Sequence, residues 1–513
     1  MVLPQAVAKG NGAPIPEKKQ FGPWTARAMR LFEIIYGVIA VLVFEWTMWT
    51  GKKEFRKMNA RDKKDLAAAR ERLWDLQKQP FGLTHKFCEL RDGYKMHYML
   101  SQPEGATAEK VGLVIFLHGY PDSWHIWHPL LKRANLTGAA TLVAVDLPGF
   151  GGSDSLPTYD ADTVLEVVSE FIMTMRDTYL SESPGPVVVV GHDWGALIGF
   201  RLASEASVLA DRFILSNSFF PLLARANIES SLKSVAQMFK TWIHHPTNLR
   251  LLRQIYPNLK PVLRQLSKSA YVFAFKLPWP FNLILGRMGN FWFYRLCNAL
   301  AYQSREPVTG AAGWDMLASC LGPSDIEYLS TSKSAHAEKR GSALVEDETY
   351  PHSIKHRTTT GGWATKICYY HDGLPTGIWT KSLQTLWELN QLEQASSSFS
   401  SASSSGSTRR RSGSRVGIFD IGPPGTLAAA TTVLWGQKDA ACDYAVAIEG
   451  IGDYFGVHDS HLIHLPNAGH WTTMDPQAVD VWELVIHWAV KGEGDKMMEL
   501  LEGYPAAKLV FSS

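Results

Sequence analysis

A run of four valines that enters a glycine-flanked turn constrains this chain more than any other feature. The run is Val187–Val190, and the turn that follows it reads Gly-His-Asp-Trp-Gly, with Asp193 at its centre. Unbroken β-branched residues are typical of a strand that is buried on both faces of a parallel sheet. Residues 194–204 then have helical spacing and strong helix formers. The sequence therefore predicts a strand–turn–helix unit that presents Asp193 at the carboxyl end of the sheet, where α/β folds place their chemistry.

Strand and helix patterns alternate on both sides of this unit. Short apolar runs predict strands at residues 87–90, 95–100, 111–117, 140–146, 186–190, 212–216, 431–435 and 462–465. Helical spacing is found at residues 126–133, 161–180, 194–207 and 479–489. From residue 218 to about residue 423 the pattern is helical and aromatic, without a clear strand. This order predicts an α/β fold, with a mostly parallel sheet flanked by helices and an inserted all-helical lid.

The same patterns divide the chain into segments. We expect a disordered tail at 1–30, a transmembrane helix at 31–50, a charged linker or helix at 51–84, a first part of the sheet domain at 85–218, a helical lid at 219–427, a second part of the sheet domain at 428–495 and a C-terminal tail at 496–513. Low complexity predicts disorder within the lid at 330–348 and 395–415. The second of these stretches is rich in Ser and Arg, and we favour a tolerated surface insertion over a docking segment.

The apolar run Leu31–Trp49 has nearly the length that a bilayer-spanning helix needs. Its acidic residues, Glu33 and Glu45, lie near its ends, and aromatic residues along it fit a membrane-interface belt. A core helix or a cleaved signal peptide fits less well, because polar segments flank the run and no small-residue cleavage site follows it. Basic residues are more numerous after the run than before it, which favours a single-pass membrane protein with its catalytic part in the cytosol.

Composition adds few further constraints. The chain of 513 residues, 46% hydrophobic and 19% charged, suits one large or two fused globular domains with extra segments. A net charge of +2 gives no indication of a nucleic-acid partner. The five cysteines are scattered and lack metal or CxxC spacing, so neither a disulfide framework nor a metal site is expected.

The side chain at the sharp turn determines the class of substrate. Hydrolases usually carry Ser in such a turn, within Gly-x-Ser-x-Gly, whereas this chain carries Asp193. A carboxylate nucleophile attacks an electrophilic saturated carbon and forms an ester. A serine-type esterase mechanism is therefore disfavoured.

An aspartate nucleophile needs a base that activates water and an acid that orients this base. His470 follows the last predicted strand, and Asp439 follows the strand before it. The chain order of nucleophile, acid and base is the one that α/β hydrolases use. Asp443 is a nearby alternative to Asp439. The simpler interpretations are that the Asp is an ordinary turn residue and that the His is an ordinary surface residue.

A second turn, His118-Gly119-Tyr120-Pro121, directly follows the strand that is expected to end at Leu117. The backbone N–H groups of Tyr120 and Trp194 would face the nucleophile there and form an oxyanion hole. We expect side chains of the same loop to contact the substrate, namely His118, Pro121 and Trp124.

With these motifs, the chain resembles the epoxide hydrolases of the α/β-hydrolase superfamily, in particular the membrane-anchored kind. The motifs are His-Gly-Tyr-Pro-Asp-Ser-Trp at 118–124, Asp-Leu-Pro-Gly-Phe-Gly at 146–151, Gly-His-Asp-Trp-Gly at 191–195, Leu-Trp-Gly-Gln-Lys-Asp at 434–439 and Gly-His-Trp at 469–471. The resemblance implies the α/β-hydrolase fold and the hydrolysis of an epoxide to a vicinal diol through an ester on Asp193. It also implies that no metal or organic cofactor is used, and it suggests the endoplasmic reticulum membrane as the location.

The resemblance further implies two lid tyrosines that hydrogen-bond the epoxide oxygen. Residues 269–278 are similar to the first tyrosine segment and select Tyr271, although the family usually has Gln where Lys276 stands. Residues 362–371 are similar to the second segment and select Tyr370, with Tyr369 as the alternative. A buried aromatic residue of a helical lid is the other interpretation of each position.

Two other functions fit part of the pattern. A haloalkane dehalogenase shares the Asp nucleophile but commonly has Asn where Tyr120 stands, and a fluoroacetate-type enzyme would have Arg in place of Trp194. A membrane-tethered scaffold that has lost activity would lack one of the three triad residues, and none is lacking. We therefore expect a lipophilic epoxide as the substrate, such as a fatty-acid or terpenoid epoxide, because the lid is rich in Trp and Phe near a membrane segment. The sequence identifies no protein partner.

Overall fold

A mostly parallel sheet forms the centre of the computed structural model, which describes residues 23–50, 58–101, 112–181, 184–303, 310–338, 349–402 and 425–513. Its nine strands, within these residues, have the order β1-β2-β4-β3-β5-β6-β7-β8-β9. The strands are β1 Thr84–Glu89, β2 Lys95–Ser101, β3 Gly112–Leu117, β4 Ala140–Val145, β5 Val187–His192, β6 Arg212–Ser216, β7 Ala430–Gly436, β8 His461–Leu465 and β9 Lys508–Ser512. Strands β3 to β8 pair in parallel, whereas β1, β2 and β9 join the sheet antiparallel.

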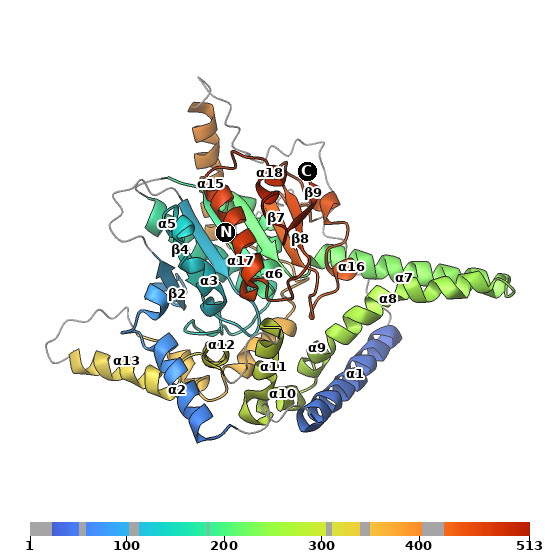
Figure 1. The fold of residues 1–513 in the computed structure, drawn as a ribbon, viewed down its shortest axis with the longest axis horizontal. Helices are drawn as coiled ribbons and strands as arrows, with labels where there is room; N and C mark the ends of the chain where they lie inside the picture. The colour runs from blue at the N-terminus through green and yellow to red at the C-terminus, as the bar shows by residue number, and fades with distance from the viewer. Residues whose placement is uncertain are drawn as a thin grey trace, which may run out of the picture.

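Every residue of β3, β4 and β5 is buried, as the valine run predicts for strands covered on both faces. Helices pack on both faces of the sheet (Figure 1). They are α3 His128–Leu131, α4 Ala134–Thr137, α5 Ala161–Leu180, α6 Trp194–Glu205, α16 Tyr444–Ala447, α17 Pro476–Val490 and α18 Met497–Leu501. The predicted fold class is confirmed. The helix expected at 126–133 is instead a 3-10 turn at Trp124–Trp127 followed by the single turn of α3, whose start is set by a proline.

The insertion between β6 and β7 is helical throughout its described part. Its helices are α7 Pro221–His244, α8 Leu249–Lys268, α9 Ala270–Phe275, α10 Ile284–Arg287, α11 Trp292–Ala301, α12 Ala311–Leu321, α13 Asp325–Glu338, α14 Trp363–Lys366 and α15 Leu383–Ala402. Helices α9 to α12 lie together beyond one end of the sheet, and α7 and α8 form a long projecting hairpin (Figure 1). Helix α15 lies at the opposite end, where Thr385 bonds Glu166 of α5, so the last part of the insertion is not part of the lid.

Two boundary predictions were wrong. Residues 496–513 are not a simple tail, because they contain α18 and the edge strand β9, which pairs with β8. Of the stretches expected to be disordered, residues 330–338 belong to α13 and residues 395–402 belong to α15. The remainder of both stretches, at 339–348 and 403–415, lies outside the described residues, as do residues 1–22 of the expected tail.

Helix α1, Pro23–Thr50, begins before the predicted start at residue 31 and contains the predicted apolar run. Its segment Trp24–Thr50 is long and apolar enough to cross a membrane. One face of α1 packs on the lid, where a Cβ atom at Gly37 would lie 2.5 Å from the backbone oxygen of Phe273. Lys276, which stands where a Gln was expected, has its ammonium 3.7 Å from the Glu33 carboxylate of α1. The helix is therefore attached to the lid along one side and exposes apolar residues on the other.

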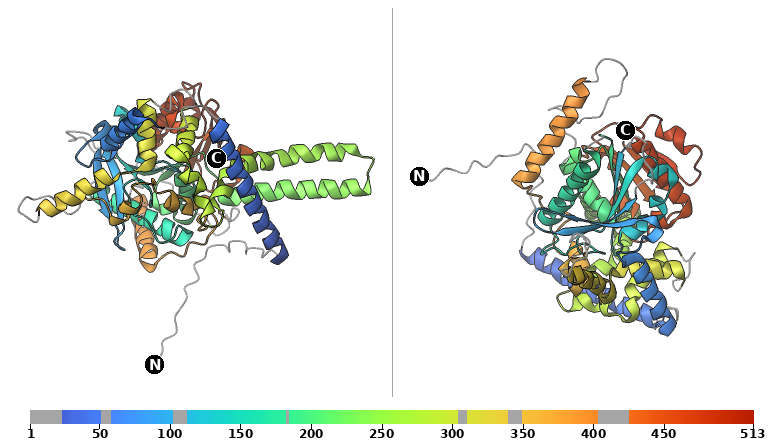
Figure 2. Two further views of the ribbon diagram at one scale, coloured as in Figure 1. Left: turned by 90° about the horizontal axis from the view of Figure 1, so that it is seen from below. Right: turned by 90° about the vertical axis from the view of Figure 1, so that its left-hand side faces the viewer.

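Helix α2, Ala60–Trp74, is the charged helix expected between the apolar run and the sheet. A capping box between Asn59 and Asp62 begins it. Its buried face, which includes Leu66 and Leu73, packs toward α12, and the Trp74 indole donates to Ala318 at 2.9 Å. Both N-terminal helices thus lie against the insertion (Figure 2), and the Trp74 ring at the end of α2 also packs on His97 of β2.

Candidate active site

Asp193 lies in the sharp turn between β5 and α6, with φ +50° and ψ −116°. A non-glycine residue in this region is strained, and such strain is common where a side chain must be presented for chemistry. The turn is possible because its neighbours are glycines: a Cβ atom at Gly195 would lie 2.1 Å from the Leu117 oxygen, and one at Gly119 would lie 2.4 Å from the Asp193 Cβ. The sequence order of strand, glycine turn and helix thus positions this carboxylate at the end of the sheet.

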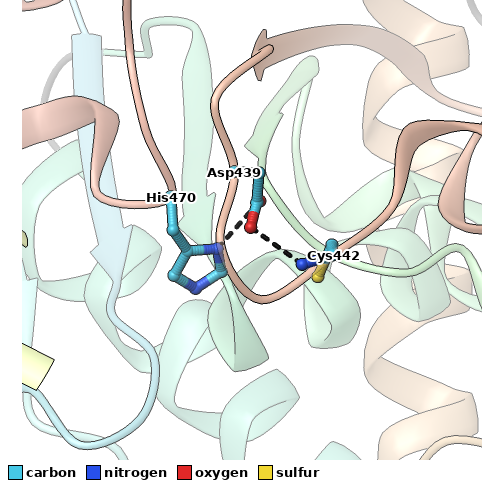
Figure 3. Close-up of side chains that lie close together, drawn as sticks. All are labelled: Asp439, Cys442 and His470. Carbon is cyan, nitrogen blue, oxygen red and sulfur yellow. Dashed lines mark hydrogen bonds and ion pairs between the residues drawn. The ribbon is translucent and has the colours of Figure 1, made fainter. Parts of the chain in front are cut away.

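His470 lies between two carboxylates. Its Nδ1 is 2.9 Å from Asp439 Oδ2, and its Nε2 is 3.7 Å from Asp193 Oδ1. Figure 3 shows the first of these contacts. Asp443, the alternative acid, is engaged elsewhere, because it caps α16 and pairs with Arg264 at 2.7 Å. The geometry therefore favours Asp439 as the partner of the imidazole.

The Asp439 carboxylate is held by several donors besides His470. Its Oδ1 accepts from the backbone N–H groups of Ala441 at 2.6 Å and Cys442 at 2.8 Å. Its Oδ2 also accepts from the side-chain amide of Asn217 at 2.6 Å. Burial raises the Asp439 pKa, but the charge of His470 and these hydrogen bonds outweigh it, so the pKa lies below its usual value. Asp439 is therefore a stable anion that orients the imidazole.

The three charges shift each other's pKa values. Burial lowers the His470 pKa, but the negative charges of Asp439, Asp193 and Asp122 raise it to about 9. Burial raises the Asp193 pKa above its usual value, although His470 and the N–H groups of Tyr120 and Trp194 act in the opposite direction. In the resting site His470 therefore carries a proton at neutral pH, and this charge supports the anionic form of Asp193.

Two backbone N–H groups face the Asp193 carboxylate. The Tyr120 N–H donates to Asp193 Oδ2 at 2.8 Å, and the Trp194 N–H also hydrogen-bonds this carboxylate. Donors fixed in the backbone are already oriented, so they stabilise negative charge on an oxygen at this point without reorganisation. This arrangement is the one that an oxyanion hole at Tyr120 and Trp194 requires.

Two tyrosines of the insertion lie near enough to Asp193 for its charge to act on them. Tyr271 lies on α9 and Tyr370 ends the 3-10 helix Ile367–Tyr370; their ring centroids are 6.0 Å apart, and their hydroxyl groups interact. Burial and the nearby Asp193 charge raise the pKa of both phenols well above the usual value. Both hydroxyls consequently remain protonated and can donate. The Tyr369 hydroxyl donates instead to the Pro148 oxygen at 3.0 Å, which favours Tyr370 for the second position.

Two of the expected substrate contacts have other tasks. His118 is fully buried, with Nδ1 2.8 Å from the Gly119 oxygen and Nε2 accepting from the Leu147 N–H at 2.9 Å. Burial lowers its pKa to about 4, so it joins the two turns as a neutral ring. Trp124 is also fully buried, and its ring packs edge-on against Trp74 at 6.3 Å. Both residues therefore belong to the core, and the prediction that they touch substrate is corrected.

Pro121 is buried, and its backbone oxygen accepts from Lys366, a residue that the sequence did not single out. The Lys366 ammonium is completely enclosed and also donates to the Cys320 oxygen. It lies 4.9 Å from the Phe150 ring centroid and 5.4 Å from that of Tyr294. Burial lowers the Lys366 pKa to about 8. This lysine connects α14 of the insertion with the loop that carries the Tyr120 donor.

Three further residues around the triad were missed. Asn217 supports Asp439 and has φ +47°; its only sequence signal is its place directly after β6. Asp122 accepts from the Trp471 indole at 2.8 Å, and burial raises its pKa to about 7. Lys268 at the end of α8 donates to the backbone oxygens of Asp439 and Cys442 at 2.6 and 2.7 Å. None of these contacts has a local sequence pattern, because each joins distant segments.

Asp439, Cys442 and His470 also place three potential metal-ligand atoms within 4.8 Å of one another (Figure 3). Their donor chemistry fits a metal poorly. Both Asp439 oxygens already accept from N–H groups, and the Nδ1 atom of His470 is bound to this carboxylate. Burial and the neighbouring Asp439 and Asp193 charges raise the Cys442 pKa well above its usual value, which disfavours the thiolate that a metal needs. The cluster is an acid–imidazole pair with a thiol beside it.

Comparisons with known proteins find relatives of part of this chain. A model of the alpha/beta hydrolase family matches residues 114–354. Epoxide hydrolase 3 of Mus musculus is 26% identical over 187 residues, 36% of this chain and 40% of that protein. Epoxide hydrolase 4 of Homo sapiens is 25% identical over 198 residues, 38% of this chain and 43% of that protein. The chain thus matches about two fifths of the length of these relatives. The Cif epoxide hydrolase structure from Acinetobacter nosocomialis has a TM-score of 0.45 and 15% identity, covering 84% of this chain and 97% of that one.

Proposed function

We propose that this chain, whose residues 114–354 match the alpha/beta hydrolase family, hydrolyses lipophilic epoxides to vicinal diols through a covalent ester on Asp193. The observation that carries the proposal is the position of this carboxylate: its Oδ1 is 3.7 Å from His470 Nε2, and its charge acts on the phenols of Tyr271 and Tyr370. A nucleophile, a base and two acidic donors around one point match the needs of epoxide opening. The names of the relatives support the same reaction.

In the first step, an Asp193 oxygen forms a bond to one oxirane carbon while the carbon–oxygen bond of the ring breaks. Tyr271 and Tyr370 stabilise the oxygen as it becomes an alkoxide, and one of them supplies its proton. Because their pKa values are raised, both phenols remain protonated until negative charge develops on the epoxide oxygen. Protonated His470 does not impede this step, because its charge favours the attacking carboxylate.

In the second step, water attacks the ester carbonyl and the Asp193–substrate ester bond breaks. Alkylation removes the negative charge of Asp193, which is one of the charges that raise the His470 pKa to about 9. The pKa of His470 therefore falls when the ester forms, and its proton passes to the tyrosinate that ring opening leaves behind. The neutral imidazole then takes one proton of the attacking water, and the other goes to the diol oxygen that leaves Asp193. The Tyr120 and Trp194 N–H groups hold the oxyanion until the diol leaves.

A single turnover in heavy-oxygen water tests the covalent route. The first diol should contain no label, and the label should appear in the Asp193 carboxylate when its peptide is analysed by mass spectrometry. Label in that first diol would exclude the ester. A parallel panel of epoxides and haloalkanes decides the substrate class: diol formation supports the proposal, whereas halide release alone, or binding without turnover, would replace it.

We further propose that α1 attaches the protein to a membrane, with the endoplasmic reticulum as the compartment and the catalytic part in the cytosol. The length and hydropathy of α1, its exposed apolar face and the basic residues that follow it support this proposal. Resistance to alkaline extraction and protease access to the catalytic part in sealed microsomes would test attachment and orientation separately. Loss from the membrane in alkali would contradict the anchor.

A further inference from the structure

Helices α7 and α8 form a hairpin that projects away from the rest of the described chain (Figures 1 and 2). Near its base, α7 meets α16, where Asn227 donates to the oxygens of Val446 and Glu449. Beyond this point the two helices pack on each other, and their outward faces lie in solvent. The exposed side chains of these two helices indicate what the hairpin contacts.

The outward face of α7 carries an apolar stripe beside a basic one. Leu232, Phe239 and Ile243, spaced by seven and four residues, are 47%, 48% and 56% exposed. Lys233 and Lys240, one position further along the chain, are exposed as well. Large apolar side chains exposed at helical spacing beside lysines are typical of helices that lie at a membrane surface, where the ammonium groups reach the headgroups.

On the outward face of α8, apolar and basic residues alternate along a single stripe. Leu249, Tyr256 and Leu263 recur every seven residues and are 57%, 63% and 43% exposed. Arg253 and Lys260 lie between them, each four residues after an apolar member, and both are exposed. The second helix therefore has the same combination of apolar and cationic side chains as the first.

Charge separates this hairpin from the rest of the chain. Residues 221–268 contain eight lysines and arginines and a single acidic residue, Glu229, whereas the whole chain has 51 basic and 49 acidic residues. Anionic lipid surfaces attract such basic segments electrostatically. The hairpin thus complements an anionic bilayer in charge as well as in apolar surface.

The base of the hairpin is joined to the candidate membrane helix. The Tyr36 hydroxyl of α1 donates to the Leu266 oxygen of α8 at 3.1 Å. The Tyr36 ring also packs edge-on against Phe273 of α9 at 4.9 Å. Contact of the exposed apolar face of α1 with a bilayer would therefore bring the hairpin close to the same surface.

From these observations, we propose that the α7–α8 hairpin is a second membrane contact, which docks on the surface of an anionic lipid bilayer. The exposed leucines, Phe239, Ile243 and Tyr256 enter the headgroup region, and the lysines and arginines between them pair with lipid phosphates and carboxylates. The docking goes beyond epoxide hydrolysis and does not depend on it. It places the lid, which α1 and the hairpin flank, against the phase in which lipophilic molecules dissolve.

The test uses the full chain in nanodiscs, with an environment-sensitive fluorophore on Phe239→Cys and the half-buried Cys368 changed to Ser. A label on Met498→Cys, a well exposed position of α18, is the positional control. On discs that contain phosphatidylserine, the Phe239 label should shift to the blue and lose at least half of its quenching by aqueous iodide. On neutral phosphatidylcholine discs, and for the Met498 label on both, the change should be small. High salt should reverse the shift.

Charge reversal sharpens the test. Changing Lys233, Lys240, Arg253 and Lys260 to Glu should abolish the shift, whereas changing four exposed lysines elsewhere should not, namely Lys86, Lys132, Lys355 and Lys491. The proposal would be overturned if both charge-reversal variants lost the fluorescence shift equally, or if the shift were equal on neutral and anionic discs. A shift that needs high protein concentration and no lipid would overturn it as well. Binding of the protein to neutral discs measures membrane attachment by α1 alone. Turnover of a water-soluble epoxide in detergent measures catalysis alone. A failure of hairpin docking can therefore be distinguished from a failure of attachment or of catalysis.

Discussion

The two halves of the candidate site are built by different means. On the sheet side, Asp193 and Asp439 are held by backbone N–H groups and by direct hydrogen bonds of 2.6–2.9 Å. On the lid side, Tyr271 and Tyr370 are held by edge-on packing of aromatic rings, such as that of Tyr370 on Trp194 at 4.8 Å. The carboxylates on the sheet side are thus held by hydrogen bonds, and the tyrosines on the lid side by aromatic packing. We therefore expect sheet-side changes to abolish single chemical steps and lid-side changes to slow ring opening by degrees.

Replacing the nucleophile should have the largest effect. Asp193→Asn preserves the size of the side chain but removes the attacking anion, so kcat/KM should fall by about 10⁴-fold or more. Diol formation measured over hours is the appropriate assay. An unchanged thermal unfolding transition would show that the fold is intact, and residual activity within tenfold of the wild type would refute nucleophilic catalysis at this position.

Replacing the base should separate the two steps. His470→Gln should still open the ring but hydrolyse the ester about 10³- to 10⁴-fold more slowly, since only the second step needs a base. The signature is a burst of at most one equivalent and a stable mass adduct on the Asp193 peptide. Absence of an adduct together with slow steady turnover would indicate that His470 acts in ring opening instead.

The lid tyrosines should show intermediate effects. Tyr271→Phe and Tyr370→Phe should each lower the single-turnover rate of ring opening by about 10²-fold, as expected when one preorganised donor is lost. Tyr369→Phe is the matched control: it loses the bond to Pro148 and costs about 1 kcal/mol of stability, with little change in rate. A larger effect from Tyr369 than from Tyr370 would reverse the assignment.

The pH dependence should differ between the steps. Ring opening needs ionised Asp193, and burial raises the pKa of this carboxyl, so its rate should fall about tenfold per pH unit on acidification, from a higher pH than for an ordinary Asp. Ester hydrolysis needs neutral His470, so its rate should rise with pH, with a midpoint below the value of about 9 in the resting site. Stopped-flow single turnovers resolve both, and a pH-independent second step would argue against the base.

The smallest effect should come from the outer support of the acid. Asn217→Ala removes one donor of Asp439, which retains His470 and two backbone N–H groups, so turnover should fall by about tenfold or less. The His470 pKa should rise slightly, because Asp439 becomes the stronger base, and this shift is measurable by NMR titration. An effect as large as that of His470→Gln would mean that the sheet side is less redundantly built than we infer.

The sequence predicted the sheet side of the site better than it predicted features that depend on distant parts of the chain. The valine run and the two glycine turns place Asp193 at the sheet end, and the pattern of residues 161–180 matches α5 residue for residue. Strand β9 was missed, since a five-residue edge strand has too little periodicity to be recognised before its partner is known. Trp124 shows the converse error, because a motif residue beside an active site can still point into the core.

What the sequence alone determined is therefore local: the buried strands, the strained turn at Asp193 and the order of nucleophile, acid and base. These features depend on backbone geometry and on residues close together in the chain. Only the tertiary structure bonded Tyr369 to Pro148, brought Asn217 to Asp439 and Lys366 to Pro121, and joined α1 to the hairpin. Each of these outcomes depends on which distant segments pack together, and buried polar groups find their partners only after that packing is complete.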